Sequence, residues 1–178
     1  MPSAHMYDKS DIFAQNLRQI VDRLAKNFDF VLIDCPAGVE KGFMRSVGAA
    51  SEAIIVTTPH IASIRDANKV LSLLKTFELQ EINLIINRVR GDLILNEKSM
   101  SVEDIISLLG TNILGVIPED DEVSLCSSSG QVLNRGNAER AFYILAENLI
   151  SGTEYVYDCT RQYRGFLGGI KRLLKKNL

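Results

Sequence analysis

The chain has 178 residues, 46% of them apolar, and a formal net charge of −2. This length corresponds to one ordinary domain, and the near-neutral charge excludes a disordered chain and a globally basic nucleic-acid-binding protein. Three widely spaced cysteines without a CxxC pair exclude a zinc centre and a secreted disulfide framework, which predicts a reducing cytoplasm. No apolar run approaches the roughly 20 residues that a membrane-spanning helix needs.

Strands and helices alternate along the chain. The expected elements are helices over residues 10–27, 42–50, 61–77, 101–110 and 138–150, and strands over 28–34, 52–59, 81–87 and 112–118. A polar loop is expected between the last strand and the last of these helices. Such alternation predicts an α/β fold, a parallel sheet flanked by helices. The expected division is a nucleotide-binding domain over 1–151, a tether over 152–162 and an amphipathic helix over 163–178.

The strand over 28–34 is the first candidate for function. It is an apolar run that ends on Asp34, followed by Cys35, Pro36, Ala37 and Gly38. Parallel α/β sheets bind ligands at the carboxyl ends of their strands, so Asp34 is a candidate for holding hydrated magnesium beside phosphates. The alternative is that Asp34 only caps a turn.

Two further polar loops follow strands and should reach the same edge of the sheet. One is Asn87-Arg88, and the other begins at Pro118-Glu119. An Asn amide offers a donor and an acceptor, so Asn87 can bind the Watson–Crick edge of adenine, and a loop limited by a proline can wall the base. Taken alone, Asn87 fits a simple turn residue at the end of a strand better than a base contact, but the three loops together predict nucleotide binding.

The last residues form a basic amphipathic helix. One side of the predicted helix carries the apolar residues Phe166, Leu167, Ile170, Leu173 and Leu174. The other side carries the cations Arg164, Lys171, Arg172, Lys175 and Lys176. This pattern is typical of a helix that lies on an acidic membrane surface. A helix docked on the globule and a nucleic-acid-binding tail are the alternatives.

Several stretches together resemble the MinD family of septum-site-determining P-loop ATPases. They are FDFVLIDCPAGVEKGF at 28–43, INRV at 86–89, VIPED at 116–120 and GFLGGIKRLLKKNL at 165–178. The resemblance implies a Walker B role for Asp34, which would contact magnesium through water, and a switch loop that includes Gly38. It also implies nucleotide contacts from Asn87, Arg88, Pro118 and Glu119. Partition ATPases of the ParA type share a DxPAG-like motif.

One element of the family is missing from this sequence. The chain contains no Gly-x4-Gly-Lys-[Ser/Thr] motif, whose backbone amides and lysine hold phosphates. We therefore expect an N-terminally truncated fragment of a P-loop ATPase that turns over little ATP alone, since phosphoryl transfer depends on positioned charge.

The resemblance also implies cofactors, partners and a location. These are ATP and Mg²⁺, a homodimer formed with ATP, a MinC-like division inhibitor, a MinE-like or equivalent topological regulator, and an acidic phospholipid membrane. No nucleic acid is expected. The protein would be cytoplasmic and peripheral on the inner face of the cell membrane, or on its plastid counterpart. The alternatives are a non-catalytic membrane-recruitment module and a ParA-type partition ATPase fragment.

Overall fold

A computed structural model describes residues 9–36 and 38–176 of the chain. The elements are α1 (Lys9–Leu24), α2 (Lys41–Ala49), β1 (Glu52–Thr57), α3 (Ile61–Leu74), β2 (Glu81–Val89), α4 (Gly91–Leu95), α5 (Val102–Leu109), β3 (Asn112–Pro118), α6 (Asp121–Ser129), α7 (Asn137–Ser151), a 3₁₀ turn η1 (Arg161–Tyr163) and α8 (Gly165–Lys176). They form two compact units, residues 1–53 with 72–82, and residues 54–71 with 83–178. Ala37 and the side chains of Ser10, Asp11, Lys175 and Lys176 lie outside the described residues.

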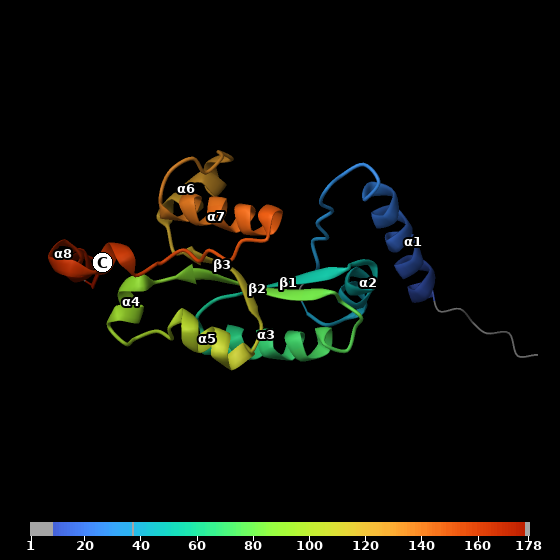
Figure 1. The fold of residues 1–178 in the computed structure, drawn as a ribbon, viewed down its shortest axis with the longest axis horizontal. Coiled ribbons are helices and arrows are strands. Elements are labelled where there is room, and N and C mark those ends of the chain that lie inside the picture. The colour runs from blue at the N-terminus through green and yellow to red at the C-terminus, as the bar shows by residue number, and fades with distance from the viewer. Residues whose placement is uncertain (1–8, 37, 177–178) are drawn as a thin grey trace, which may run out of the picture. The chain divides into compact units, whose positions relative to one another are not determined.

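The sheet of the described residues has the strand order β1-β2-β3. Strand β2 runs parallel to β3, with Ile86 opposite Val116 and Val89 opposite Pro118. Helix α7 lies on one side of β3 and α5 on the other (Figure 1). The predicted parallel sheet with flanking helices is therefore confirmed, and the fold places the carboxyl ends of β2 and β3 side by side.

The core of the second unit lies on both faces of this sheet. Its fully buried large side chains are Ile64, Leu71, Leu84, Ile86, Val89, Ile105 and Val116. Each contributes about 1.5–3 kcal/mol by leaving water. Gly115 brings α7 close to β3, because a Cβ at this position would lie 2.7 Å from Cδ1 of Leu145.

The local signals for α5 are confirmed. Ser101 Oγ accepts a hydrogen bond from the backbone N–H of Asp104, and the Asp104 carboxylate accepts one from the backbone N–H of Ser101. This reciprocal capping box begins the helix. Gly110 ends it in the left-handed conformation, with φ of 59°.

The predicted strand over 28–34 is wrong. Residues 28–36 form no strand, and Phe28, Phe30 and Leu32 are 60%, 50% and 78% exposed. An apolar run becomes a strand only when a neighbouring strand pairs with its backbone, and among the described residues no strand is paired with this segment. Asp34 therefore lies within a segment of the first unit that forms no strand.

Two helices lie outside the elements that the sequence predicts. The polar loop expected after β3 contains α6, which Asp120 caps at its start and Gly130, with φ of 66°, closes at its end. The short α4 follows β2 directly. Neither segment shows a strong apolar stripe in the sequence, so periodicity alone does not reveal them.

Candidate functional site

Strands β2 and β3 bring Arg88 and Glu119 together at their carboxyl ends. The pairing of Val89 with Pro118 continues into a hydrogen bond from the Glu119 backbone N–H to the Val89 carbonyl, at 3.0 Å. Arg88 Nε donates to both Glu119 carboxylate oxygens, at 3.0 and 3.3 Å, and Nη2 donates at 3.0 Å. This two-pronged hydrogen bond and the charge of Glu119 raise the pKa of the Arg88 guanidinium.

The backbone of Arg88 is unusual. Its φ is +59°, which a residue with a side chain rarely adopts. Asn87 Oδ1 accepts a hydrogen bond from the Arg88 backbone N–H at 2.9 Å, and this contact helps to hold the turn. Strained backbone held by its surroundings is often found at ligand sites.

The Asn87 amide keeps the hydrogen-bonding capacity that an adenine base needs. Its Oδ1 has a second lone pair beside the one that Arg88 uses, and its Nδ2 carries two donors. The donors suit a ring nitrogen of adenine and the oxygen suits its exocyclic amine. Asn87, Arg88, Pro118 and Glu119 therefore form one contiguous cluster whose chemistry fits a nucleotide base.

Asp120 fixes the loop beside this cluster. One carboxylate oxygen accepts from the backbone N–H of Glu122 at 3.1 Å, and the other accepts from those of Asn137 and Ala138 at 2.8 and 3.0 Å. One side chain thus binds the starts of α6 and α7. The sequence identifies Asp120 as a residue that can cap a helix, but only the folded structure shows its hydrogen bonds to the start of α7.

Asp34 and Gly38, predicted to act near magnesium and in a switch loop, belong to the first unit. Both are exposed, and Gly38 has φ of +91°, a conformation that a glycine adopts readily. In the described part of the chain, no group of three or more His, Cys, Asp and Glu residues is placed to bind a metal ion.

The C-terminal helix α8 presents apolar side chains to solvent. Phe166, Leu167, Leu173 and Leu174 are 65–86% exposed, and Ile170 is 44% exposed. The 3₁₀ turn η1 precedes α8, and its Tyr163 is buried. No helix of the described residues is both long enough and apolar enough to span a bilayer.

Comparison with known proteins identifies relatives of this chain. Residues 8–150 match a family model described as ParA, NUBPL iron-transfer P-loop NTPase. The septum site-determining protein MinD of Synechocystis is 39% identical over 75% of this chain and 50% of its own length. The MinD protein of Bacillus subtilis is 33% identical over 96% of this chain and 65% of its own length. The chain thus spans about half to two thirds of these curated relatives.

Two solved MinD structures are also similar to this chain. The MinC:MinD complex of Aquifex aeolicus matches with a TM-score of 0.75 and 31% identity, over 80% of this chain and 60% of that one. MinD of Pyrococcus horikoshii, solved with Mg-ADP, matches with a TM-score of 0.68 and 30% identity, over 78% of this chain and 57% of that one.

Proposed function

This chain belongs to the MinD and ParA family of P-loop NTPases, and we propose that it forms the base-binding and membrane-binding part of an ATPase that helps to place the division septum. The observation that carries the proposal is its 33–39% identity to septum site-determining MinD proteins over 75–96% of its length. The contiguous cluster at the ends of β2 and β3 supports it independently.

We assign the adenine of ATP to Asn87, Arg88, Pro118 and Glu119. Asn87 would bind the base edge, while the Arg88–Glu119 pair and Pro118 would form the walls around the base. Asp34 would bind magnesium through water, and the loop through Gly38 would respond to the terminal phosphate. The Mg-ADP found in the Pyrococcus horikoshii relative supports this choice of ligand. ATP with magnesium supplies the phosphoryl group whose transfer the family catalyses.

We propose that this chain alone binds ATP weakly and hydrolyses little of it, because its sequence has no P-loop motif to hold the phosphates. A titration with a fluorescent ATP analogue and magnesium tests this. No binding at micromolar concentrations is expected, and binding in that range would contradict the proposal.

The base site can be tested by supplying the missing motif. Co-expression with the P-loop-containing segment of the Bacillus subtilis relative should restore binding of the analogue. Asn87→Ala should then weaken binding about tenfold, the effect of one lost hydrogen bond of about 1.4 kcal/mol. Exposed Asn134→Ala is the matched control. An equal effect of both substitutions would place the base elsewhere.

We propose that α8 anchors the protein peripherally on the inner face of the membrane. Its exposed apolar side chains would enter the interface, while Lys171, Arg172, Lys175 and Lys176 attract acidic lipids at about 1 kcal/mol for each cation. Removal of residues 165–178 should abolish sedimentation with acidic liposomes. Unchanged sedimentation would reject the anchor.

The proposed assembly has three protein partners: a second copy of this chain, a MinC-like inhibitor and a MinE-like regulator. With ATP, the protein would form a homodimer, whose two tails bind far more tightly than one because the second engagement is intramolecular. A MinC-like inhibitor would bind this dimer, a choice that the MinC:MinD complex of Aquifex aeolicus supports, and a MinE-like regulator would control it. Light scattering with the restored P-loop segment, with and without ATP, tests the dimer. A mass that ATP does not change would contradict it.

A further inference from the structure

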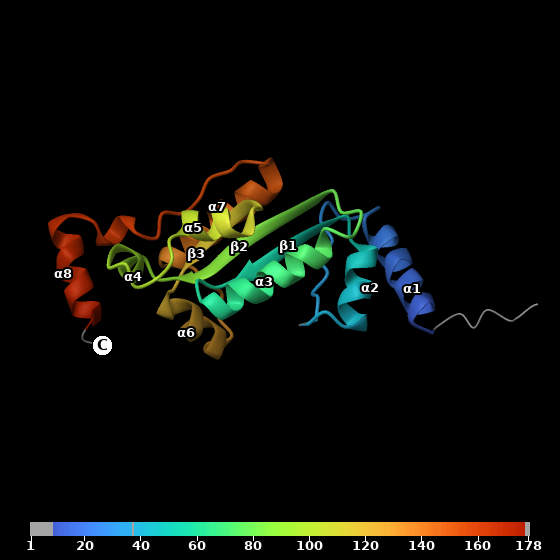
Figure 2. The same ribbon diagram turned by 90° about the horizontal axis from the view of Figure 1, so that it is seen from below.

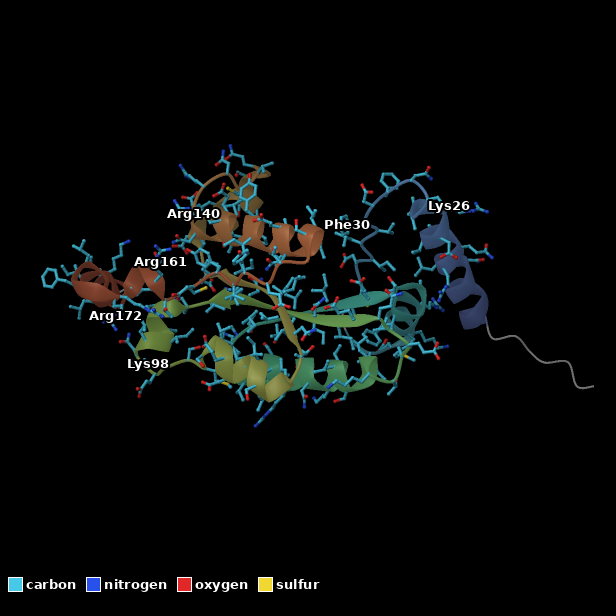
Figure 3. The ribbon with its side chains drawn as sticks, viewed as in Figure 1. Lys26, Phe30, Lys98, Arg140, Arg161 and Arg172 are labelled. Atoms are coloured by element: carbon cyan, nitrogen blue, oxygen red, sulfur yellow. The ribbon has the colours of Figure 1, made fainter. Side chains whose placement is uncertain are left out.

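Residues of α4 and α8 and the residues next to them line a groove of about 860 Å³ in the second unit. Figure 2 shows these two helices near one another in the ribbon. Both apolar and basic side chains line it. The apolar ones include Leu93, Ile170 and Leu173, and the basic ones are Arg90, Lys98 and Arg172. Figure 3 shows Arg172 on α8 and Lys98 beyond α4 at the same end of this unit. Such a mixture suits a ligand with one charged end and one apolar end.

The α4 side of the groove is built by a helix-ending motif. The Lys98 backbone N–H donates to the Leu93 carbonyl at 2.9 Å, and that of Glu97 donates to the Ile94 carbonyl at 3.0 Å. The backbone of Glu97 adopts the left-handed conformation, with φ of 55°. This is the hydrogen-bond pattern of a Schellman motif. It fixes the backbone of Lys98 beside Leu93, on the wall of the groove.

The α8 side is held by close backbone packing. A Cβ on Gly91 would lie 1.9 Å from the Cys159 carbonyl oxygen, and a Cβ on Gly168 would lie 2.3 Å from the Tyr163 carbonyl carbon. Only glycine permits these approaches. The segment before α8 is thus docked on the start of α4, and α8 on that segment. The two walls therefore belong to one packed unit.

The charge of the groove is positive. Arg90 donates to both oxygens of Asp92, at 2.8 and 2.6 Å, so this pair is neutral. Asp92 is the one carboxylate in the lining. Lys98 and Arg172 form no ion pair with any described residue. Two cations therefore remain to attract an anion, directly beside exposed Leu173 and half-exposed Ile170.

We propose that this groove binds the headgroup of an acidic phospholipid in the membrane surface. Lys98 and Arg172 would contact the headgroup anion, and the apolar side chains of α8 would meet the start of the acyl chains. The inference rests on the proposed membrane association, but it adds a residue outside α8. The membrane-binding surface would then consist of α8 together with the end of α4.

Vesicle sedimentation of the full chain tests the groove, with phosphatidylcholine vesicles that do or do not contain phosphatidylglycerol. Lys98→Glu should weaken binding to the acidic vesicles about tenfold, and Lys98→Arg should restore it. Exposed Lys75→Glu, the same charge change in the turn after α3 and outside the groove lining, should change binding less than twofold. Circular dichroism and unfolding midpoints confirm that each variant is folded.

The outcomes separate the groove from the anchor. Equal binding of Lys98→Glu and the unchanged chain would overturn the groove and leave α8 as the anchor. An equal loss for Lys75→Glu would also overturn it, since the effect would then be general charge attraction. Equal binding to neutral and acidic vesicles would overturn the headgroup assignment. No binding of the unchanged chain would overturn both the groove and the proposed anchor.

Discussion

Replacing Asn148 by alanine should strongly destabilise the second unit. This side chain is 3% exposed and lies near the end of α7. Its Nδ2 donates to the carbonyls of Leu114 and Tyr155 at 2.8 and 2.7 Å. Its Oδ1 accepts from Thr153 Oγ1 and from the Tyr155 backbone N–H at 2.8 and 3.1 Å. One amide thus joins β3, α7 and the segment that leads toward α8.

The magnitude follows from these four hydrogen bonds. Each contributes about 1 kcal/mol net, and a buried group that loses its partner costs about 1–3 kcal/mol. The Leu114 carbonyl belongs to a residue that is only 8% exposed, so water does not readily replace the amide there. We expect Asn148→Ala to lower the free energy of unfolding by about 3–4 kcal/mol, a large share of a typical domain's stability.

Urea unfolding followed by circular dichroism measures this effect. The neighbouring Glu147→Ala on the same helix is the matched control, because Glu147 is exposed and should change the free energy by less than about 0.5 kcal/mol. Hydrogen exchange at the Tyr155 amide should accelerate in the Asn148 variant only. A loss below about 1 kcal/mol, or an equal loss in the control, would refute the assigned role of the amide.

Three further substitutions test individual parts of the fold. Gly91→Ala should cost at least about 2 kcal/mol in urea unfolding, because its Cβ would overlap the Cys159 carbonyl, and a neutral result would contradict the close packing. Glu97→Gly should instead stabilise the chain by about 1 kcal/mol, since glycine adopts the observed positive φ readily; a loss of stability would argue against the motif. Burial, and then the charge of Asp158, raise the pKa of the Cys159 thiol from 9.0 to about 12. The folded state therefore favours the protonated thiol, and stability should fall from pH 9 to pH 12 by up to about 1.4 kcal/mol per pH unit. Cys159→Ala should remove this part of the pH dependence in unfolding measurements, and an unchanged profile would exclude it.

Local signals predict the ends of elements correctly because they act within a few residues. The Ser101–Asp104 capping box, the glycine at position 110 and the proline at 118 mark element ends through short-range hydrogen bonds and backbone preferences. The apolar patterns of β2 and β3 likewise predict buried parallel strands. Together they indicate the candidate cluster at Asn87 and Glu119, since parallel strands end at one edge.

The features that the sequence does not predict depend on contacts between residues distant in the chain. An apolar run like 28–34 is the same sequence whether or not a neighbouring strand pairs with it, and only pairing makes it a strand. Asp120 could be recognised as a cap, but not as the acceptor for Asn137, seventeen residues away. The sequence alone determined the α/β fold class, and it is also the source of the proposed base-site residues and of the proposed membrane-binding C-terminal segment. Tertiary structure alone placed Lys98 and Arg172 in the lining of one groove, because the close contacts of Gly91 with Cys159 and of Gly168 with Tyr163 pack α4 and α8 against the segment that precedes α8.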